Sequence, residues 1–111
     1  MDFLAEITMS IMQKQRARDP EAGYARDFIA MLEPVLAKIV KDRTKIITNA
    51  GGVNPSACAL AIEGLAKRLG VPVRIAIVHH DDILQQFSQL RTQGHEFRNM
   101  ETGDDCTEIA N

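Results

Sequence analysis

The spacing of apolar residues predicts helices in the first part of the chain. Residues 5–17 are rich in good helix formers, and the apolar ones recur at helical spacing (Ile7, Ile11 and Met12). Residues 24–41 carry a broader apolar stripe that Pro34 interrupts. Because proline cannot continue a helix without a kink, we expect this second segment to bend or to split into two short helices.

The middle of the chain has the pattern of a strand, a helix and a second strand. Residues 45–48 are rich in β-branched side chains and residues 71–78 are almost continuously apolar, which is typical of buried parallel strands. Between them, Asn54-Pro55 forms a helix start and Gly70 stands where a helix is expected to end. The sequence therefore predicts a βαβ unit over residues 44–82, with a right-handed crossover.

The predicted fold class is α/β: a partial parallel-sheet domain in the order helix-helix-strand-helix-strand-helix, part of a three-layer sandwich. Asp82 and Gln85 are spaced as a capping box for the last helix, which ends near Arg91. Apolar residues then become rare, so we expect a domain over residues 1–103 and a disordered tail over residues 104–111. Since two parallel strands do not make an independent sheet, the chain is expected to be a fragment of a larger domain.

Composition and charge argue against a nucleic-acid-binding protein, a membrane-spanning protein and a secreted protein. The formal net charge is −2, from 13 basic and 15 acidic residues, which gives no electrostatic case for binding nucleic acid. No apolar run approaches the roughly 20 residues of a membrane span, and the N-terminus lacks the basic region of a signal peptide. Cys58 and Cys106 are therefore predicted to be free thiols in the cytoplasm.

Residues 49–54 form an Asn/Gly-rich loop between the first predicted strand and the following helix. Ligands bind at the carboxyl ends of strands in open α/β sheets, and a helix N-terminus favours an anion. Gly51 and Gly52 let the backbone approach a ligand closely, and Asn49 and Asn54 can add amide donors. The loop is thus predicted to bind a phosphate or carboxylate. The alternative is a tight strand-to-helix turn that needs no ligand.

Other candidates for chemistry lie outside this loop. His79 and His80 precede Asp81, the candidate catalytic or ligand-binding residue, whereas Asp82 is assigned to the helix cap. These residues could hold a divalent metal, but metal sites usually need three or four protein ligands, and no metal site is predicted. Cys58 could be a nucleophile near the helix N-terminus, although its apolar neighbours favour a buried thiol.

Several stretches of the sequence match a known family residue by residue. They are Asp2-Phe3-Leu4-Ala5-Glu6-Ile7-Thr8-Met9-Ser10-Ile11, Gln15-Arg16-Ala17-Arg18-Asp19-Pro20, Gly23-Tyr24-Ala25-Arg26-Asp27-Phe28, Ile47-Thr48-Asn49-Ala50-Gly51-Gly52-Val53-Asn54-Pro55, Cys58-Ala59, Asp81-Asp82 and Glu101-Thr102-Gly103. In these stretches the chain resembles the N-terminal domain of the acyclic terpene utilisation family. That family's Gly-rich opening strand and loop would precede residue 1, and it tends to place Gly where this chain has His79-His80.

The resemblance implies a role in the breakdown of citronellol- and geraniol-type compounds. It directs the loop prediction to an anionic small molecule like an acyl-CoA or a terpenoid acid, bound by Asn49, Gly51, Gly52, Asn54 and Asp81. It also allows Glu6 and Thr8 to face the same crevice. The residues indicate neither a reaction nor a cofactor. The alternatives are a non-catalytic assembly subunit or oligomer whose sheet edges pair with a partner chain, and a metal-dependent hydrolase using His79, His80 and Asp81.

Overall fold

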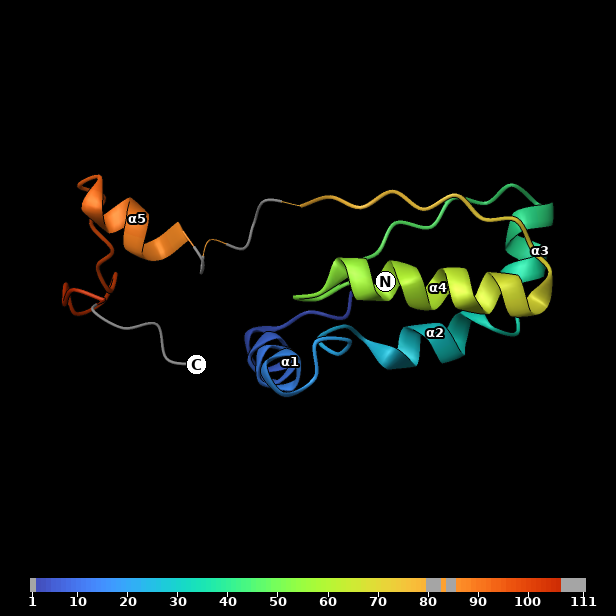
Figure 1. Cartoon of the computed structure of the whole chain (residues 1–111), viewed down its shortest axis with the longest axis horizontal. Coiled ribbons are helices and arrows are strands. Elements are labelled where there is room, and N and C mark those ends of the chain that lie inside the picture. The colour runs from blue at the N-terminus through green and yellow to red at the C-terminus, as the bar shows by residue number, and fades with distance from the viewer. Residues whose placement is uncertain (1, 80–82, 84–85, 107–111) are drawn as a thin grey trace. The chain divides into compact units, whose positions relative to one another are not determined.

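The computed structural model describes residues 2–79, 83 and 86–106. The chain divides into two compact units, Met1–Val78 and His79–Asn111, which are described separately. The described residues form five helices (Figure 1): α1 (Glu6–Arg18), α2 (Arg26–Leu32), α3 (Leu36–Lys41), α4 (Pro55–Leu69) and α5 (Phe87–Thr92).

The predicted helices of the first unit are confirmed, with local reasons for their ends. α1 stops at Arg18 because Asp19 is extended, with a φ of −139°, ahead of Pro20. The predicted interruption at Pro34 separates α2 from α3, since Glu33 to Val35 form a turn between the two helices.

α4 has both of the termini that the sequence predicts. The Asn54 side chain accepts a hydrogen bond from the Ala57 N–H at 3.3 Å, and proline begins the first turn. At the other end Gly70 adopts a left-handed φ of +65°, and Val71 donates its N–H to the Ala66 carbonyl at 2.9 Å.

The predicted α/β fold with a parallel sheet is wrong, because the described residues contain helices but no strand. Residues 45–48 and 71–78 are extended and run in the same direction on one side of α4 (Figure 1). However, no hydrogen bond joins their backbones in the described part of the chain. Apolar, β-branched sequence favours an extended backbone, but a strand also requires a partner backbone about 4.8 Å away.

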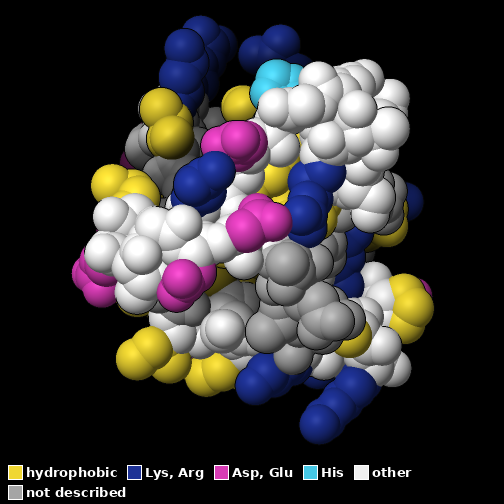
Figure 2. Space-filling model, turned by 90° about the vertical axis from the view of Figure 1, so that its left-hand side faces the viewer, with side chains coloured by type: hydrophobic (Ala, Val, Ile, Leu, Met, Phe, Trp, Pro, Cys, Tyr) yellow, Lys and Arg dark blue, Asp and Glu magenta, His cyan; other side chains and the backbone are white. Residues whose placement is uncertain are grey.

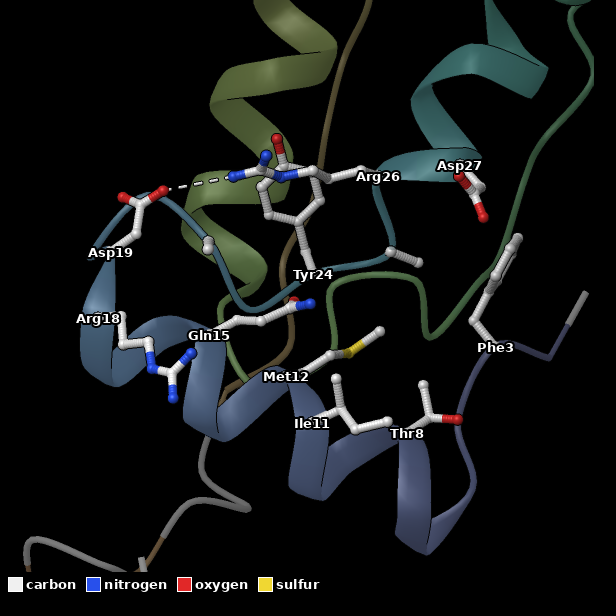
Figure 3. A pocket seen from close by; sticks show the side chains of 12 residues that line it. Phe3, Thr8, Ile11, Met12, Gln15, Arg18, Asp19, Tyr24, Arg26 and Asp27 are labelled. Atoms are coloured by element: carbon white, nitrogen blue, oxygen red, sulfur yellow. Dashed lines mark hydrogen bonds and ion pairs between the residues drawn. The ribbon is translucent and has the colours of Figure 1, made fainter.

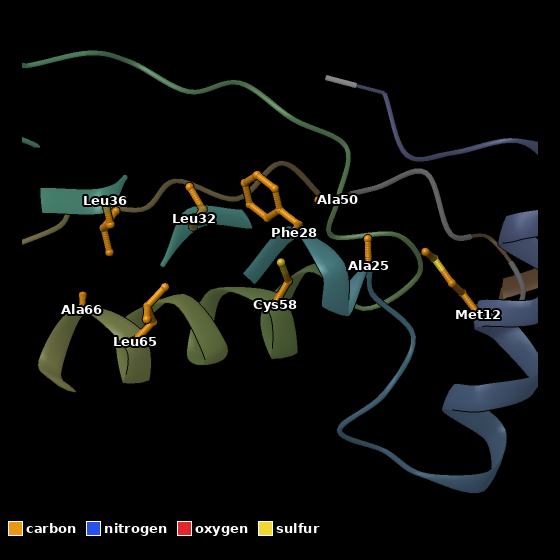
Figure 4. Packing of buried hydrophobic residues seen from close by; sticks show 9 residues of the cluster. All are labelled: Met12, Ala25, Phe28, Leu32, Leu36, Ala50, Cys58, Leu65 and Ala66. Atoms are coloured by element: carbon orange, nitrogen blue, oxygen red, sulfur yellow. The ribbon is translucent and has the colours of Figure 1, made fainter. Parts of the chain in front are cut away.

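A helical core holds the first unit together instead of a sheet. Side chains from α2 and α3 pack against α4, and residues before α2 and from the 49–54 loop complete the cluster (Figure 4): Met12, Ala25, Phe28, Leu32, Leu36, Ala50, Cys58, Leu65 and Ala66. Leu65 is only 2% exposed. Phe3 packs edge-to-face on Phe28, with ring centroids 5.5 Å apart, which attaches the N-terminal segment to this core.

The second unit is built around α5 and the chain that returns to it. The rings of Phe87 and Phe97 lie 4.7 Å apart, and Arg91 forms a salt bridge with Asp105 at 2.7 Å. The N–H of Cys106 donates to the Phe97 carbonyl at 2.8 Å, so the chain is hydrogen-bonded as far as residue 106. Residues 107–111 of the predicted tail, and Asp82 and Gln85 of the predicted capping box, lie outside the described residues.

Side chains of both charge signs are exposed on the protein. Figure 2 shows basic, acidic and hydrophobic side chains at the surface. In the described part of the chain, no helix is both long enough and apolar enough to cross a membrane.

Candidate functional site

The 49–54 loop is fixed by hydrogen bonds within itself and to the turn before α2. Inside the loop, Gly52 N–H donates to the Asn49 carbonyl at 3.0 Å, and Asn54 N–H donates to the Gly51 carbonyl at 2.9 Å. Val53 N–H donates to the Gly23 carbonyl at 3.0 Å. The loop therefore has one well-defined shape before any ligand arrives.

Asn49 connects the loop to the N-terminal segment. Its amide nitrogen donates to the Asp2 carboxylate at 2.6 Å, and its amide oxygen accepts from the Phe3 N–H at 2.9 Å. The hydrogen bond from Asn49, followed by one from the Leu4 N–H, lowers the pKa of Asp2. Both polar atoms of the Asn49 side chain are thus engaged within the protein.

Asn54 is buried and joins three parts of the first unit. Its amide nitrogen donates to the carbonyls of Pro20 and Ala22, both at 2.8 Å, while its oxygen caps α4. Only 8% of the residue is exposed. These bonds use both amide protons, so Asn54 sets the shape of the loop from inside.

The loop glycines are required by close packing. Gly52 has a φ of +54°, and a Cβ there would lie 2.5 Å from the Met12 sulfur and 2.7 Å from the Gly23 carbonyl oxygen. A Cβ on Gly51 would lie 2.9 Å from Pro55. α1 and the start of α4 therefore lie closer to the loop than a residue with a Cβ at position 51 or 52 would allow.

The loop leaves some of its donors available. Among the described residues, the backbone N–H groups of Gly51 and Ser56 have no hydrogen-bond acceptor. Both lie near the N-terminus of α4, where the helix dipole favours negative charge. The structure brings Asn49, Gly51, Gly52 and Asn54 together, whereas Asp81 lies outside the described residues, so a shared site stays a prediction.

A pocket of about 550 Å³ that is open to solvent, called the cavity below, lies between α1 and the segment that leads into α2 (Figure 3). It has an apolar part formed by Phe3, Ile11, Met12, Ala22, Tyr24 and Ala25, and a polar part formed by Thr8, Gln15, Arg18, Asp19, Arg26 and Asp27. Thr8, which the resemblance allowed to face the crevice of the 49–54 loop, lines this pocket, which no residue of that loop lines. Met12 lies between the cavity and Gly52, so the loop supports the cavity from behind.

The cations of the cavity differ in their environment. Arg26 forms a salt bridge with Asp19 at 3.3 Å, drawn in Figure 3, and Asp19 also accepts a hydrogen bond from the Glu21 N–H. Arg18 is exposed and forms no salt bridge with any other described residue. Its guanidinium is therefore the cation of this cavity best able to accept an incoming anion.

Sequence reasoning did not identify the cavity, although one signal was present. The sequence places Ile7, Ile11 and Met12 at helical spacing, yet among the described side chains of α1 only Met12 is buried, and Ile11 is 51% exposed. A predicted helix with apolar residues that its neighbours do not cover can mark a ligand surface.

The remaining candidates do not form a second site in the described residues. Cys58 is buried, and burial raises its pKa, which supports the interpretation as a core thiol. Cys58 and Cys106 are both free. His79 is exposed, while His80 and Asp81 lie outside the described residues. No group of three His, Cys, Asp or Glu side chains able to hold a metal occurs in the part that the structure describes.

Comparison with known proteins identifies the family. The family model described as acyclic terpene utilisation family protein AtuA matches residues 1–111. The chain belongs to this family. No curated protein and no solved structure matches it.

Membership of the AtuA family confirms the resemblance found in the sequence and connects the chain with acyclic terpene utilisation. The residues that carried the resemblance fall on both features of this subsection. One stretch, residues 47–55, contains the fixed loop, and another, residues 23–28, contributes a wall of the cavity.

Proposed function

We propose that this AtuA-family chain binds an acyclic, branched carboxylic acid, or its thioester, as part of acyclic terpene utilisation. The observation that carries the proposal is the cavity between α1 and residues 22–27. Its volume of about 550 Å³ is of the size of small-molecule sites, about 300–1,000 Å³, and its open side leaves part of a bound ligand in contact with water.

The lining of the cavity suits an amphipathic ligand. Ile11, Met12 and Phe3 offer apolar surface for a branched hydrocarbon chain. Burying such a chain is favourable by about 25 cal/mol per Å² of apolar area removed from water. Arg18 offers a guanidinium to a carboxylate, which it can hold through paired hydrogen bonds.

The loop supplies a second place for negative charge. We propose that the loop residues Asn49, Gly51, Gly52 and Asn54 form the wall that faces the acid, thioester or phosphate group of the ligand. The N–H groups of Gly51 and Ser56, which have no acceptor among the described residues, support this assignment. Because the side chains of Asn49 and Asn54 are already hydrogen-bonded, the backbone of the loop would make the direct contacts.

NMR titration of the isotope-labelled chain, followed by amide chemical shifts, distinguishes binding in the cavity from binding on the 49–54 loop. Citronellic acid, citronellol and coenzyme A serve as probes. A ligand in the cavity shifts the amides of Ile11, Gln15 and Tyr24, whereas an anion on the loop shifts those of Gly51 and Ser56. If citronellic acid shifts neither group of amides, the chain does not bind this class of ligand in either place.

Replacing Arg18 tests the polar end of the cavity. We expect Arg18→Met to weaken citronellic acid binding about tenfold, which corresponds to about 1.4 kcal/mol, because the carboxylate loses its partner. Citronellol, which has no carboxylate, should bind both proteins alike. Calorimetric titration measures both affinities.

Lys14→Met is the matched control, since Lys14 is an exposed cation of the same helix that does not line the cavity. Equal losses in Lys14→Met and Arg18→Met would show that net charge acts on the ligand, and that Arg18 is not its partner.

One alternative function has an observation in its favour. Residues 45–47 and 72–78 are extended and form no backbone hydrogen bond with the described part of the chain, which supports an assembly role and is developed below. For a metal-dependent hydrolase, the described residues offer no group of three ligands, and His80 and Asp81 lie outside them.

A further inference from the structure

Two extended segments of the first unit have backbone groups without partners. In the described part of the chain, residues 45–47 and 72–78 form no backbone hydrogen bond, either as donor or as acceptor. Neither segment lies in a helix. A row of unpaired N–H and C=O groups on an extended segment is a template for pairing with another extended backbone.

Residues 71–76 already have the alternation of a strand that is covered on one face. Val71, Val73 and Ile75 are half-buried, and Val73 packs against the helical core, whereas Pro72, Arg74 and Ala76, between them, are exposed. The segment is thus held in register by its inner face while its edge remains open.

The end of this segment and the other extended segment expose large apolar side chains. Val78 is 92% exposed and Ile77 is 37% exposed, and Ile47 is 91% exposed. Exposed β-branched side chains on an extended, unpaired backbone are the kind of surface that strand addition covers.

The charged residues of the two extended segments are all basic. Residues 45–48 and 71–78 contain the basic residues Lys45 and Arg74 and no acidic residue. Neither of these cations forms a salt bridge with another described residue. A partner that covers the surface is therefore favoured if it carries carboxylates.

We propose that residues 73–78 are a docking edge for an extended polypeptide segment of a partner protein, in which apolar and acidic side chains alternate. The partner's backbone pairs with the open edge from Val73 onward, because Pro72 has no N–H to donate. Its apolar side chains lie on the face of Ile75 and Ile77, and its carboxylates lie on the opposite face, where they meet Arg74. This interaction is separate from ligand binding in the cavity.

The proposal is tested with a short, blocked, fluorescent peptide of alternating Val and Glu, titrated with the full chain. Fluorescence anisotropy should show saturable binding of this peptide. A matching peptide of alternating Val and Lys should bind at least about tenfold more weakly. Arg74→Glu should remove or reverse this preference, because it changes the sign of the central charge.

Variants at Ala76 test whether the peptide binds through backbone hydrogen bonds or only through side-chain contacts. Ala76 is exposed, so Ala76→Pro removes one N–H without disturbing the core, and we expect it to weaken the Glu peptide about tenfold. Ala76→Ser keeps the N–H and should bind as the parent does. Unchanged amide shifts in α4 confirm that the variants are folded.

Three results would overturn the proposal. The first is no saturable binding of the Glu peptide at concentrations up to about 1 mM. The second is equal binding of the Glu and Lys peptides, or the same affinity in Ala76→Pro and Ala76→Ser. The third is concentration-dependent self-association by sedimentation that Ala76→Pro abolishes, since this would assign the edge to a second copy of the chain.

Discussion

At the scale of single residues, Gly52 shows how local geometry builds the candidate site. Its positive φ and the nearness of Met12 let the loop and α1 pack together, which forms the back of the cavity. The sequence predicted that Gly52 would favour ligand approach. The structure shows that its closest neighbours are atoms of the protein itself.

Gly52→Ala is expected to destabilise the chain by about 1–3 kcal/mol, because a Cβ meets the Met12 sulfur and the backbone conformation is strained. Gly64→Ala is the matched control. Gly64 is exposed on α4 with nothing within 4 Å of its added Cβ, and this substitution should stabilise the helix by about 0.5–1 kcal/mol. Chemical denaturation measures both effects. A Gly52→Ala protein as stable as the parent would contradict the close packing.

The Cys58 thiol is expected to make the stability of the folded chain fall as the pH rises in the alkaline range. Burial raises the pKa of Cys58 in the folded chain. Below the pKa of the unfolded chain both states keep the proton, and the full stability is present. As the pH rises further, the unfolded chain loses the proton first, so stability falls.

Denaturation at increasing alkaline pH should therefore show a steeper loss of stability in the parent than in Cys58→Ala. The comparison uses slopes, since the smaller side chain also changes the core. Equal slopes in the two proteins would show that Cys58 does not titrate differently on folding.

At the scale of elements, the start of α4 organises the first unit. Asn54 caps the helix and also holds the carbonyls of Pro20 and Ala22, which places the turn before α2 against the loop. The sequence predicted the cap from the Asn-Pro pair. The contacts with residues 20 and 22 depend on tertiary structure, because those residues are 34 and 32 positions away.

Asn54→Ala is expected to cost about 1–3 kcal/mol, since it removes the cap and leaves buried carbonyls without donors. Asn49→Ala should cost less, because the Asn49 side chain is exposed. Thermal unfolding followed by circular dichroism compares the two. Equal losses would mean that the buried amide of Asn54 contributes no more than an exposed one.

At the scale of the whole molecule, the fold is helical where an α/β fold was predicted. Amide hydrogen exchange distinguishes the two. We expect the amides of residues 45–47 and 73–78 to exchange rapidly, because they have no acceptor among the described residues. The amides in the middle of α4 should be protected by helical hydrogen bonds. Protection at 73–78 comparable with that of α4 would support a sheet instead.

The sequence by itself determined the helices of the first unit, the break at Pro34, the two ends of α4 and the family. These depend on local rules of proline, glycine and capping residues, or on a specific string of residues. It also predicted residues 45–48 and 71–78 to be buried parallel strands, which was wrong, because no backbone hydrogen bond joins them among the described residues. Only the tertiary structure decided that these extended segments lie beside helices, and that α1 and residues 22–27 line an open pocket. Local sequence selects the backbone conformation, whereas pairing and cavities depend on which distant segments meet.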